Sequence, residues 1–164
     1  MKTFVAPVFA ALALLSSGAH AHGGADEKAR APASTKTEDV STPFGRAGDP
    51  KKVGRTVTIR MSDTMRFTPD SVTVKRGETI RFLVKNEGKI LHEMVLGNDE
   101  GLKEHAVLMR KFPEMEHDEP YMVHVSPGKT GEMIWTFDKP GEVVFACLIP
   151  GHYEAGMTGK VTAK

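Results

Sequence analysis

The chain has 164 residues, and its 22 Lys and Arg side chains almost cancel its 21 Asp and Glu side chains. This balance gives no general attraction to nucleic acid or to an anionic membrane surface, so we expect neither as a partner. The single cysteine, Cys147, cannot form a disulfide within the chain, and its free thiol therefore needs another explanation.

The first 21 residues have the pattern of a secretory signal peptide. Lys2 precedes an apolar run at residues 4–15, and small residues follow up to Ala21. The run is shorter than the roughly 20 residues that a membrane-spanning helix needs, and no later segment is continuously apolar. We therefore expect export to the periplasm, cleavage after Ala21 and a mature protein that is not inserted in the membrane.

Residues 22–52 are rich in small, polar and charged residues and hold few large apolar side chains, which predicts a mobile arm. From residue 53 onward, short alternating apolar runs separated by Gly, Pro and charged turns predict β-strands. The runs lie at residues 56–60, 71–75, 79–85, 90–96, 121–125, 131–137, 142–148 and 158–162. About eight strands in one domain at residues 53–164 are typical of an all-β fold, a β-sandwich.

The strand pattern is interrupted at residues 98–120. Three apolar residues recur there at helical spacing: Leu102, Ala106 and Met109. Asn98 or Asp99 can cap such a helix, and Pro113 prevents its continuation. We therefore expect one short helix and an acidic loop that together form an insertion between two strands. Insertions of this kind often carry partner-specific function.

A loop near the C-terminus combines a thiol, an imidazole and a thioether, from Cys147, His152 and Met157. Four residues separate each donor from the next. A lone cysteine after a strand is usually a small buried side chain, but Pro150 and Gly156 would turn this loop so that its donors converge. Soft sulfur ligands together with imidazole favour copper, whereas zinc sites seldom use methionine. The loop therefore predicts a copper site that still needs a second imidazole.

His92 is the best candidate for this second imidazole. A histidine in a strand is more often a surface residue or a hydrogen-bonded core residue than a ligand. His92, however, lies at the start of a predicted strand, where a sandwich could bring it to the end that carries the Cys147 loop. An acidic residue, Glu93, follows it directly.

Together with His92, the Cys-x4-His-x4-Met loop resembles the cupredoxins of the plastocyanin and azurin type, and the resemblance covers about residues 56–164. It implies a Greek-key sandwich with one type 1 copper. The implied equatorial ligands are His92, Cys147 and His152, and the implied long axial ligand is Met157. In such a site the thiolate carries the electron, the methionine tunes the reduction potential and the second histidine exchanges the electron. The length of the loop leaves a blue or a green colour open.

The insertion and the strand after it are rich in further copper donors, namely His105, Met109, Met115, His117, Met122 and His124. One interpretation is structural, with the methionines in the core and the histidines solvated. The other is a second, weaker copper site, because thioether favours Cu(I) and imidazole accepts both oxidation states. His105 and Met109 would lie one helical turn apart on the same face. Cleavage after Ala21 would also leave His22 with a free amine, and this pair can chelate Cu(II).

Two functions are compatible with the predicted site. We favour copper handling or tolerance in the periplasm, because a simple carrier does not need additional donors. The insertion also resembles that of cupredoxin-like copper-tolerance proteins from proteobacteria. The alternative is a diffusible one-electron carrier between periplasmic redox partners. The predicted domain lacks the His-x-His clusters that build a catalytic copper, so we expect no enzymatic activity, and we expect a monomer.

Overall fold

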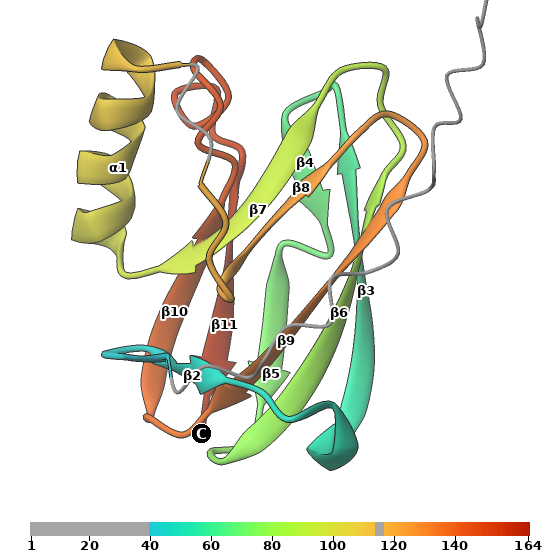
Figure 1. The fold of residues 1–164 in the computed structure, drawn as a ribbon, viewed down its shortest axis with the longest axis vertical. Coiled ribbons are helices and arrows are strands. Elements are labelled where there is room, and N and C mark those ends of the chain that lie inside the picture. Colours follow the sequence, from blue (N-terminus) through green and yellow to red (C-terminus); the bar gives the residue numbers. More distant parts are fainter. Residues whose placement is uncertain (1–39, 114–116) are drawn as a thin grey trace, which may run out of the picture. The chain divides into compact units, whose positions relative to one another are not determined.

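The computed structural model describes residues 40–113 and 117–164, which form a β-sandwich with one α-helix (Figure 1). The strands are β1 (Ser41–Thr42), β2 (Gly45–Ala47), β3 (Arg55–Ser62), β4 (Arg66–Thr68), β5 (Ser71–Val74), β6 (Glu78–Asn86), β7 (His92–Gly97), β8 (Met122–Val125), β9 (Thr130–Phe137), β10 (Gly141–Ala146) and β11 (Thr158–Ala163). A short 3-10 helix, η1 (Pro50–Lys52), precedes β3, and the α-helix α1 (Asp99–Lys111) lies between β7 and β8.

The strands are divided between two sheets. A 6-stranded sheet has the order β1-β2-β9-β6-β3-β4, and a 5-stranded sheet has the order β5-β11-β10-β7-β8. β3 runs parallel to β6 and β5 runs parallel to β11, whereas the other paired strands are antiparallel. The predicted all-β Greek-key sandwich with one inserted helix is confirmed, and every predicted strand is present. The short strands β1, β2 and β4 are additional.

The strands β1 and β2 lie within residues 22–52, for which the sequence predicts a mobile arm. β2 pairs with β9 and so extends the sheet. Phe44 stacks on Trp135 with ring centroids 5.7 Å apart, and its carbonyl oxygen accepts the indole N–H. The arm prediction is therefore wrong for residues 41–52, because a single aromatic side chain anchors this otherwise polar segment. Residues 22–39 and the predicted signal peptide lie outside the described residues.

The apolar core lies between the two sheets and reaches the end of β10. Its fully buried side chains include Phe82, Trp135, Phe137, Phe145, Cys147 and Met157. Alternate residues of a strand face the same side of the sheet, and Val143 and Phe145 both point into this core. The same alternation directs Cys147 inward, so packing of β10 fixes the position of the thiol.

α1 covers the other face of the 5-stranded sheet, beside β7 and β10 (Figure 1). The side chain of Asn98 accepts a hydrogen bond from the backbone N–H of Gly101 at 2.7 Å and so caps the helix, as predicted. The buried face of α1 packs in a second apolar cluster that contains Val95, Leu102, Ala106, Met109, Met122, Ala146 and Leu148. β7 is consequently buried on both faces. Within the described residues, neither helix has the length and apolar character needed to cross a membrane.

Candidate metal centre

Pairing between β7 and β10 brings distant segments to one end of the sandwich. His92 is the first residue of β7, and Cys147 follows directly after β10. The two strands are antiparallel, with Ala146 opposite Val95. The end of β10 therefore lies beside the start of β7. The loop that continues from Cys147 to β11 carries His152.

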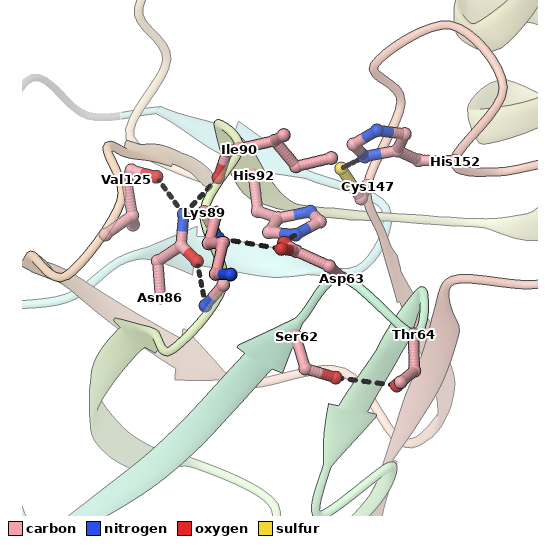
Figure 2. Close-up of polar contacts among 11 residues, drawn as sticks. Ser62, Asp63, Thr64, Asn86, Lys89, Ile90, His92, Val125, Cys147 and His152 are labelled. Carbon is pink, nitrogen blue, oxygen red and sulfur yellow. Dashed lines mark hydrogen bonds and ion pairs between the residues drawn. The ribbon is translucent and has the colours of Figure 1, made fainter.

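This arrangement brings together three of the predicted ligands. The ligand atoms of His92, Cys147 and His152 all lie within 4.8 Å of one another. Sγ of Cys147 is 3.2 Å from Nδ1 of His152 (Figure 2). The imidazole rings of His92 and His152 have centroids 4.9 Å apart. One thiol and two imidazoles at this spacing can surround a single metal ion, as in the trigonal plane of a type 1 copper site.

Backbone hydrogen bonds fold Met157 back toward the same place. The N–H of Cys147 donates to the carbonyl oxygen of Met157 at 3.1 Å, and the N–H of Met157 donates to that of His152 at 3.1 Å. Gly156 has a φ of 85°, which glycine adopts without strain, and it turns the chain just before Met157. Met157 is fully buried in the same cluster as Cys147. Axial ligation by its thioether stays a prediction.

Burial in the pocket favours the neutral forms of the Cys147 thiol and the His152 imidazole. Burial raises the pKa of the Cys147 thiol to about 12. Burial also lowers the pKa of His152, and the neighbouring His92 lowers it further. Nδ1 of His92 is buried and has no hydrogen-bond partner among the described residues. Such a donor set fits a soft metal cation, whose positive charge would stabilise the thiolate.

A buried amide that the sequence does not predict holds the turn before His92. The side-chain nitrogen of Asn86 donates to the carbonyl oxygens of Ile90 and Val125 at 2.7 and 2.8 Å, respectively. Its side-chain oxygen accepts the N–H of Gly88 at 2.8 Å. Asn86 is fully buried, and these three bonds satisfy its polar atoms. They fix the turn that leads from β6 into β7.

Glu93 joins the two ligand-bearing segments. Its side chain is buried, and Oε1 accepts the N–H of Leu148, the residue after Cys147, at 2.8 Å. Oε2 lies 2.7 Å from Nε2 of His124 on β8. A buried carboxylate needs such partners, because burial without them is costly. The acidic residue after His92 is visible in the sequence, but its partners depend on the fold.

The sequence profile of the copper binding proteins of the plastocyanin/azurin family matches residues 54–164. The chain belongs to this family. It is 51% identical over 160 residues to the copper-resistant cuproprotein CopI of Rubrivivax gelatinosus, an alignment that covers 98% of this chain and 93% of that protein. The protein of the same name from Pseudomonas aeruginosa is 36% identical over 150 residues, which covers 74% of this chain and 82% of the relative.

Solved structures of auracyanins share the fold. Auracyanin B superposes with a TM-score of 0.61 at 22% identity, covering 73% of this chain and 96% of that chain. Dithionite-reduced auracyanin from Roseiflexus castenholzii gives a TM-score of 0.59 at 23% identity, with 68% and 98% covered. At such identities the likeness shows the fold alone. Family membership and the site geometry together confirm the predicted copper cofactor, with His92, Cys147 and His152 positioned to hold the ion.

Two further methionines, Met109 of the insertion and Met122 of β8, lie in the part of this cupredoxin that the structure describes. Met109 and Met122 are buried in the apolar cluster beneath α1, as the structural interpretation predicts. Their thioethers contribute to packing of the helix on the sheet. Met115 and His22 lie outside the described residues.

The histidines of the insertion do approach one another. Nε2 of His105 lies 3.0 Å from Nε2 of His117, and the rings of His117 and His124 have centroids 6.5 Å apart. Burial lowers the pKa of His105, and His117 lowers it further. Among residues 40–113 and 117–164, however, the only group of three or more His, Cys, Asp or Glu ligands close enough for one metal is the copper pocket. The insertion therefore offers a pair of imidazoles rather than a complete site.

Proposed function

We propose that this protein acts in copper resistance by binding copper in a type 1 site formed by His92, Cys147 and His152. The proposal rests on the convergence of a buried thiol and two imidazoles in a chain whose relatives are named copper-resistant cuproproteins. We also propose that the protein is exported to the periplasm and cleaved after Ala21, because its first 21 residues have the pattern of a signal peptide.

Each ligand has its own role in the proposed site. Bound copper would supply a one-electron couple between Cu(II) and Cu(I). Cys147 would ligate as a thiolate, and the thioether of Met157 would supply a further, weaker ligand. Pairing of β7 with β10 holds His92 and Cys147 in one arrangement, and the core excludes water from both. His152 is 8% exposed whereas His92 is 0% exposed, so His152 would exchange the electron.

Copper handling explains more of this chain than electron transfer alone. His105 and His117 present two imidazole nitrogens 3.0 Å apart, which a simple carrier does not need. We propose that this pair contributes to a second, weaker copper site. We propose no enzymatic activity, because the sequence of the domain lacks the His-x-His clusters of catalytic copper sites.

One surface feature favours the diffusible electron carrier as a second candidate function. Ile90 and Leu91, directly before His92, are large apolar side chains that are 42% and 44% exposed. Exposed apolar side chains beside a redox centre could form part of a docking surface for a redox partner. A carrier needs only the type 1 site, so the number of coppers bound per chain separates the two candidates.

A copper titration of the mature protein tests the proposed site. Visible thiolate-to-copper absorption and metal per chain are measured in the same samples. The absorption should saturate at one copper per chain, and further binding after saturation would support copper handling. Cys147→Ser should abolish the absorption while far-ultraviolet circular dichroism keeps its β-sheet signal. Absence of absorption from the wild-type protein would contradict a type 1 site.

A growth assay tests the proposed role. A strain that lacks the gene receives either the wild-type sequence or Cys147→Ser and is grown at increasing copper concentrations. The wild-type sequence should restore growth and Cys147→Ser should not. Glu142→Gln, an exposed change at the opposite end of β10, controls for expression and should restore growth. Full restoration by Cys147→Ser would show that tolerance does not need the type 1 site.

A further inference from the structure

The two ring nitrogens of His92 have very different surroundings. Nε2 lies 3.1 Å from Oδ1 of Asp63, whereas Nδ1 is buried and has no hydrogen-bond partner among the described residues (Figure 2). A carboxylate only accepts hydrogen bonds, so the ring must donate through Nε2–H. In a neutral imidazole this leaves Nδ1 with a free lone pair. Asp63 thereby selects the tautomer that can ligate a metal in the pocket.

Asp63 is carried by the 6-stranded sheet, whereas His92 lies in the 5-stranded sheet. It lies in the turn between β3 and β4, where the N–H of Met65 donates to the carbonyl oxygen of Ser62 at 3.0 Å. Oγ of Ser62 and Oγ1 of Thr64 are 2.7 Å apart (Figure 2). These contacts fix the turn on both sides of Asp63, and the turn presents its carboxylate across the end of the sandwich to β7.

The other carboxylate oxygen is also held. Oδ2 of Asp63 accepts the N–H of Lys89 at 2.8 Å (Figure 2). Lys89 lies in the turn between β6 and β7 that Asn86 stabilises through the N–H of Gly88. One carboxylate thus binds both the turn before His92 and the His92 ring itself.

A glycine makes room for this carboxylate. A Cβ atom at Gly88 would overlap with Oδ1 of Asp63, so a larger residue would displace the oxygen that contacts His92. Gly88 does not have a positive φ, so its backbone conformation does not by itself require glycine. The absence of a side chain at residue 88 is explained by the position of Asp63.

We propose that Asp63 is a positioning residue for copper, which holds His92 as the Nε2–H tautomer and whose negative charge favours Cu(II) over Cu(I). This inference rests on the proposed type 1 site. A carboxylate behind a ligating histidine orients the ring and raises its basicity. A negative charge also stabilises a doubly charged ion more than a singly charged one. A backbone carbonyl in the same place would orient the ring without contributing a full charge.

Three variants separate orientation from charge. Asp63→Asn keeps the size of the side chain and one oxygen acceptor but removes the charge. Asp63→Ala removes both the oxygen acceptor and the charge. Gly88→Ala keeps Asp63 but displaces its carboxylate. Glu87→Gln is the matched control, because it removes a charge from the turn between β6 and β7 that Asp63 contacts, at a carboxylate that pairs with Arg60 and Lys85.

The first readout needs no metal. Nitrogen chemical shifts measured by NMR on the metal-free protein report which nitrogen of His92 carries the hydrogen. Wild type and Glu87→Gln should show Nε2–H alone, whereas Asp63→Ala and Gly88→Ala should show a mixture of tautomers. In the double variant Asp63→Ala with Gly88→Ala, the second change should add nothing, because the carboxylate that it displaces is gone. A pure Nε2–H tautomer in Asp63→Ala would overturn the positioning role.

The second readout is the reduction potential of the copper-loaded protein. Groups behind a ligand typically change metal affinity by about 10–100-fold, and we expect the lower value because the Asp63 side chain is 38% exposed. Asp63→Asn should lower the affinity for Cu(II) relative to Cu(I) about tenfold, which raises the potential by about 59 mV. Glu87→Gln should change it much less. Equal potentials in wild type and Asp63→Asn would overturn the charge effect.

These readouts separate failure of this inference from failure of the proposed function. A wild-type protein that binds no copper would refute the proposed site, and the metal-free NMR experiment would still decide whether Asp63 fixes the tautomer. If Asp63→Ala does not fold, Gly88→Ala and Asp63→Asn give the same two tests. Circular dichroism identifies such a variant before either measurement.

Discussion

The copper pocket and the insertion differ in how the spacing of metal donors along the chain relates to their distances in the fold. In the pocket, the ligands come from the start of β7 and from the loop between β10 and β11, yet their ligand atoms lie within 4.8 Å of one another. In the insertion and the strand after it, donors are dense along the sequence, yet Met109 and Met122 pack in an apolar cluster, and His105 and His117 contact each other. Strand register, rather than the density of donors along the chain, therefore decides where a metal pocket forms.

The difference has a physical cause in α1. A short helix is marginal by itself and gains most of its stability from packing an apolar face. Met109 lies on that face with Leu102 and Ala106, so the packing of α1 explains why its side chain is buried. In the pocket, by contrast, the core already fixes β10, and Cys147 can present its thiol at no cost to the packing. His105, on the same helix, is only partly buried, and its ring contacts that of His117 instead of packing in the apolar cluster.

His92→Gly is the change with the largest expected effect on the pocket. It removes an equatorial ligand and leaves a space at the metal, so we expect loss of the type 1 absorption. Added imidazole should restore much of it by occupying that space. Visible absorption and electron paramagnetic resonance, with and without imidazole, measure both effects. His105→Gln is the matched histidine in the insertion and should leave the absorption unchanged, whereas retained colour in His92→Gly would refute the ligand assignment.

Met109→Ala tests whether the insertion uses its methionine for packing. Met109 is 6% exposed, and truncation of a buried methionine typically lowers the free energy of unfolding by about 2–5 kcal/mol. Leu108→Ala removes a neighbouring side chain that is 49% exposed and should cost less than about 0.5 kcal/mol. Urea unfolding of the metal-free proteins measures both values. Equal losses would show that Met109 is not a core residue.

The fold could be predicted largely because its signals are local. Alternating apolar residues mark the longer strands, and Asn98 with the spacing of Leu102, Ala106 and Met109 marks α1. β1, β2 and β4 contain only 2 or 3 residues each, too few to show a pattern. Their positions depend on contacts such as that of Phe44 with Trp135, which are 91 positions apart and invisible before the chain folds.

The sequence could single out Cys147 and His152, which converge with His92, because the Cys-x4-His-x4-Met loop has a distinctive spacing. It could not single out the groups that support them. Asp63 is 29 positions from His92, and Glu93 is 55 positions from the N–H that it accepts. Aspartate in a turn and glutamate in a strand have many common roles, so only the three-dimensional contacts identify these two as parts of the site.

Glu93→Gln tests the link between the pocket and the insertion. The amide can still accept the N–H of Leu148, but it removes the negative charge opposite His124. We expect a loss of about 1–3 kcal/mol in the free energy of unfolding and a shifted visible absorption, because Leu148 follows Cys147. Glu132→Gln changes a 50% exposed carboxylate paired with Arg81 and should alter neither quantity. An unchanged stability would mean that Glu93 does not join the two regions.

The double variant His105→Gln with His117→Gln tests the proposed second copper. It should lower the number of weakly bound coppers per chain and keep the type 1 absorption, since neither residue lies in the pocket. Cys147→Ser is the reciprocal control, because it should lose the absorption and keep the weaker binding. Metal analysis after dialysis against graded copper concentrations measures both. Unchanged stoichiometry in the double variant would reject a copper site at this pair.

The smallest effect is expected from Arg110→Ala. Arg110 on α1 contacts Glu154 of the ligand loop at 2.8 Å, and Glu154 also accepts the N–H of Gly151. The two side chains are 50% and 39% exposed, so the pair should contribute at most about 1 kcal/mol, and less at high salt. Urea unfolding at two salt concentrations measures this contribution. We expect an unchanged visible absorption, because Cys147 and Met157 hold the loop through their backbone bonds, and a changed absorption would instead mean that α1 positions the ligand loop.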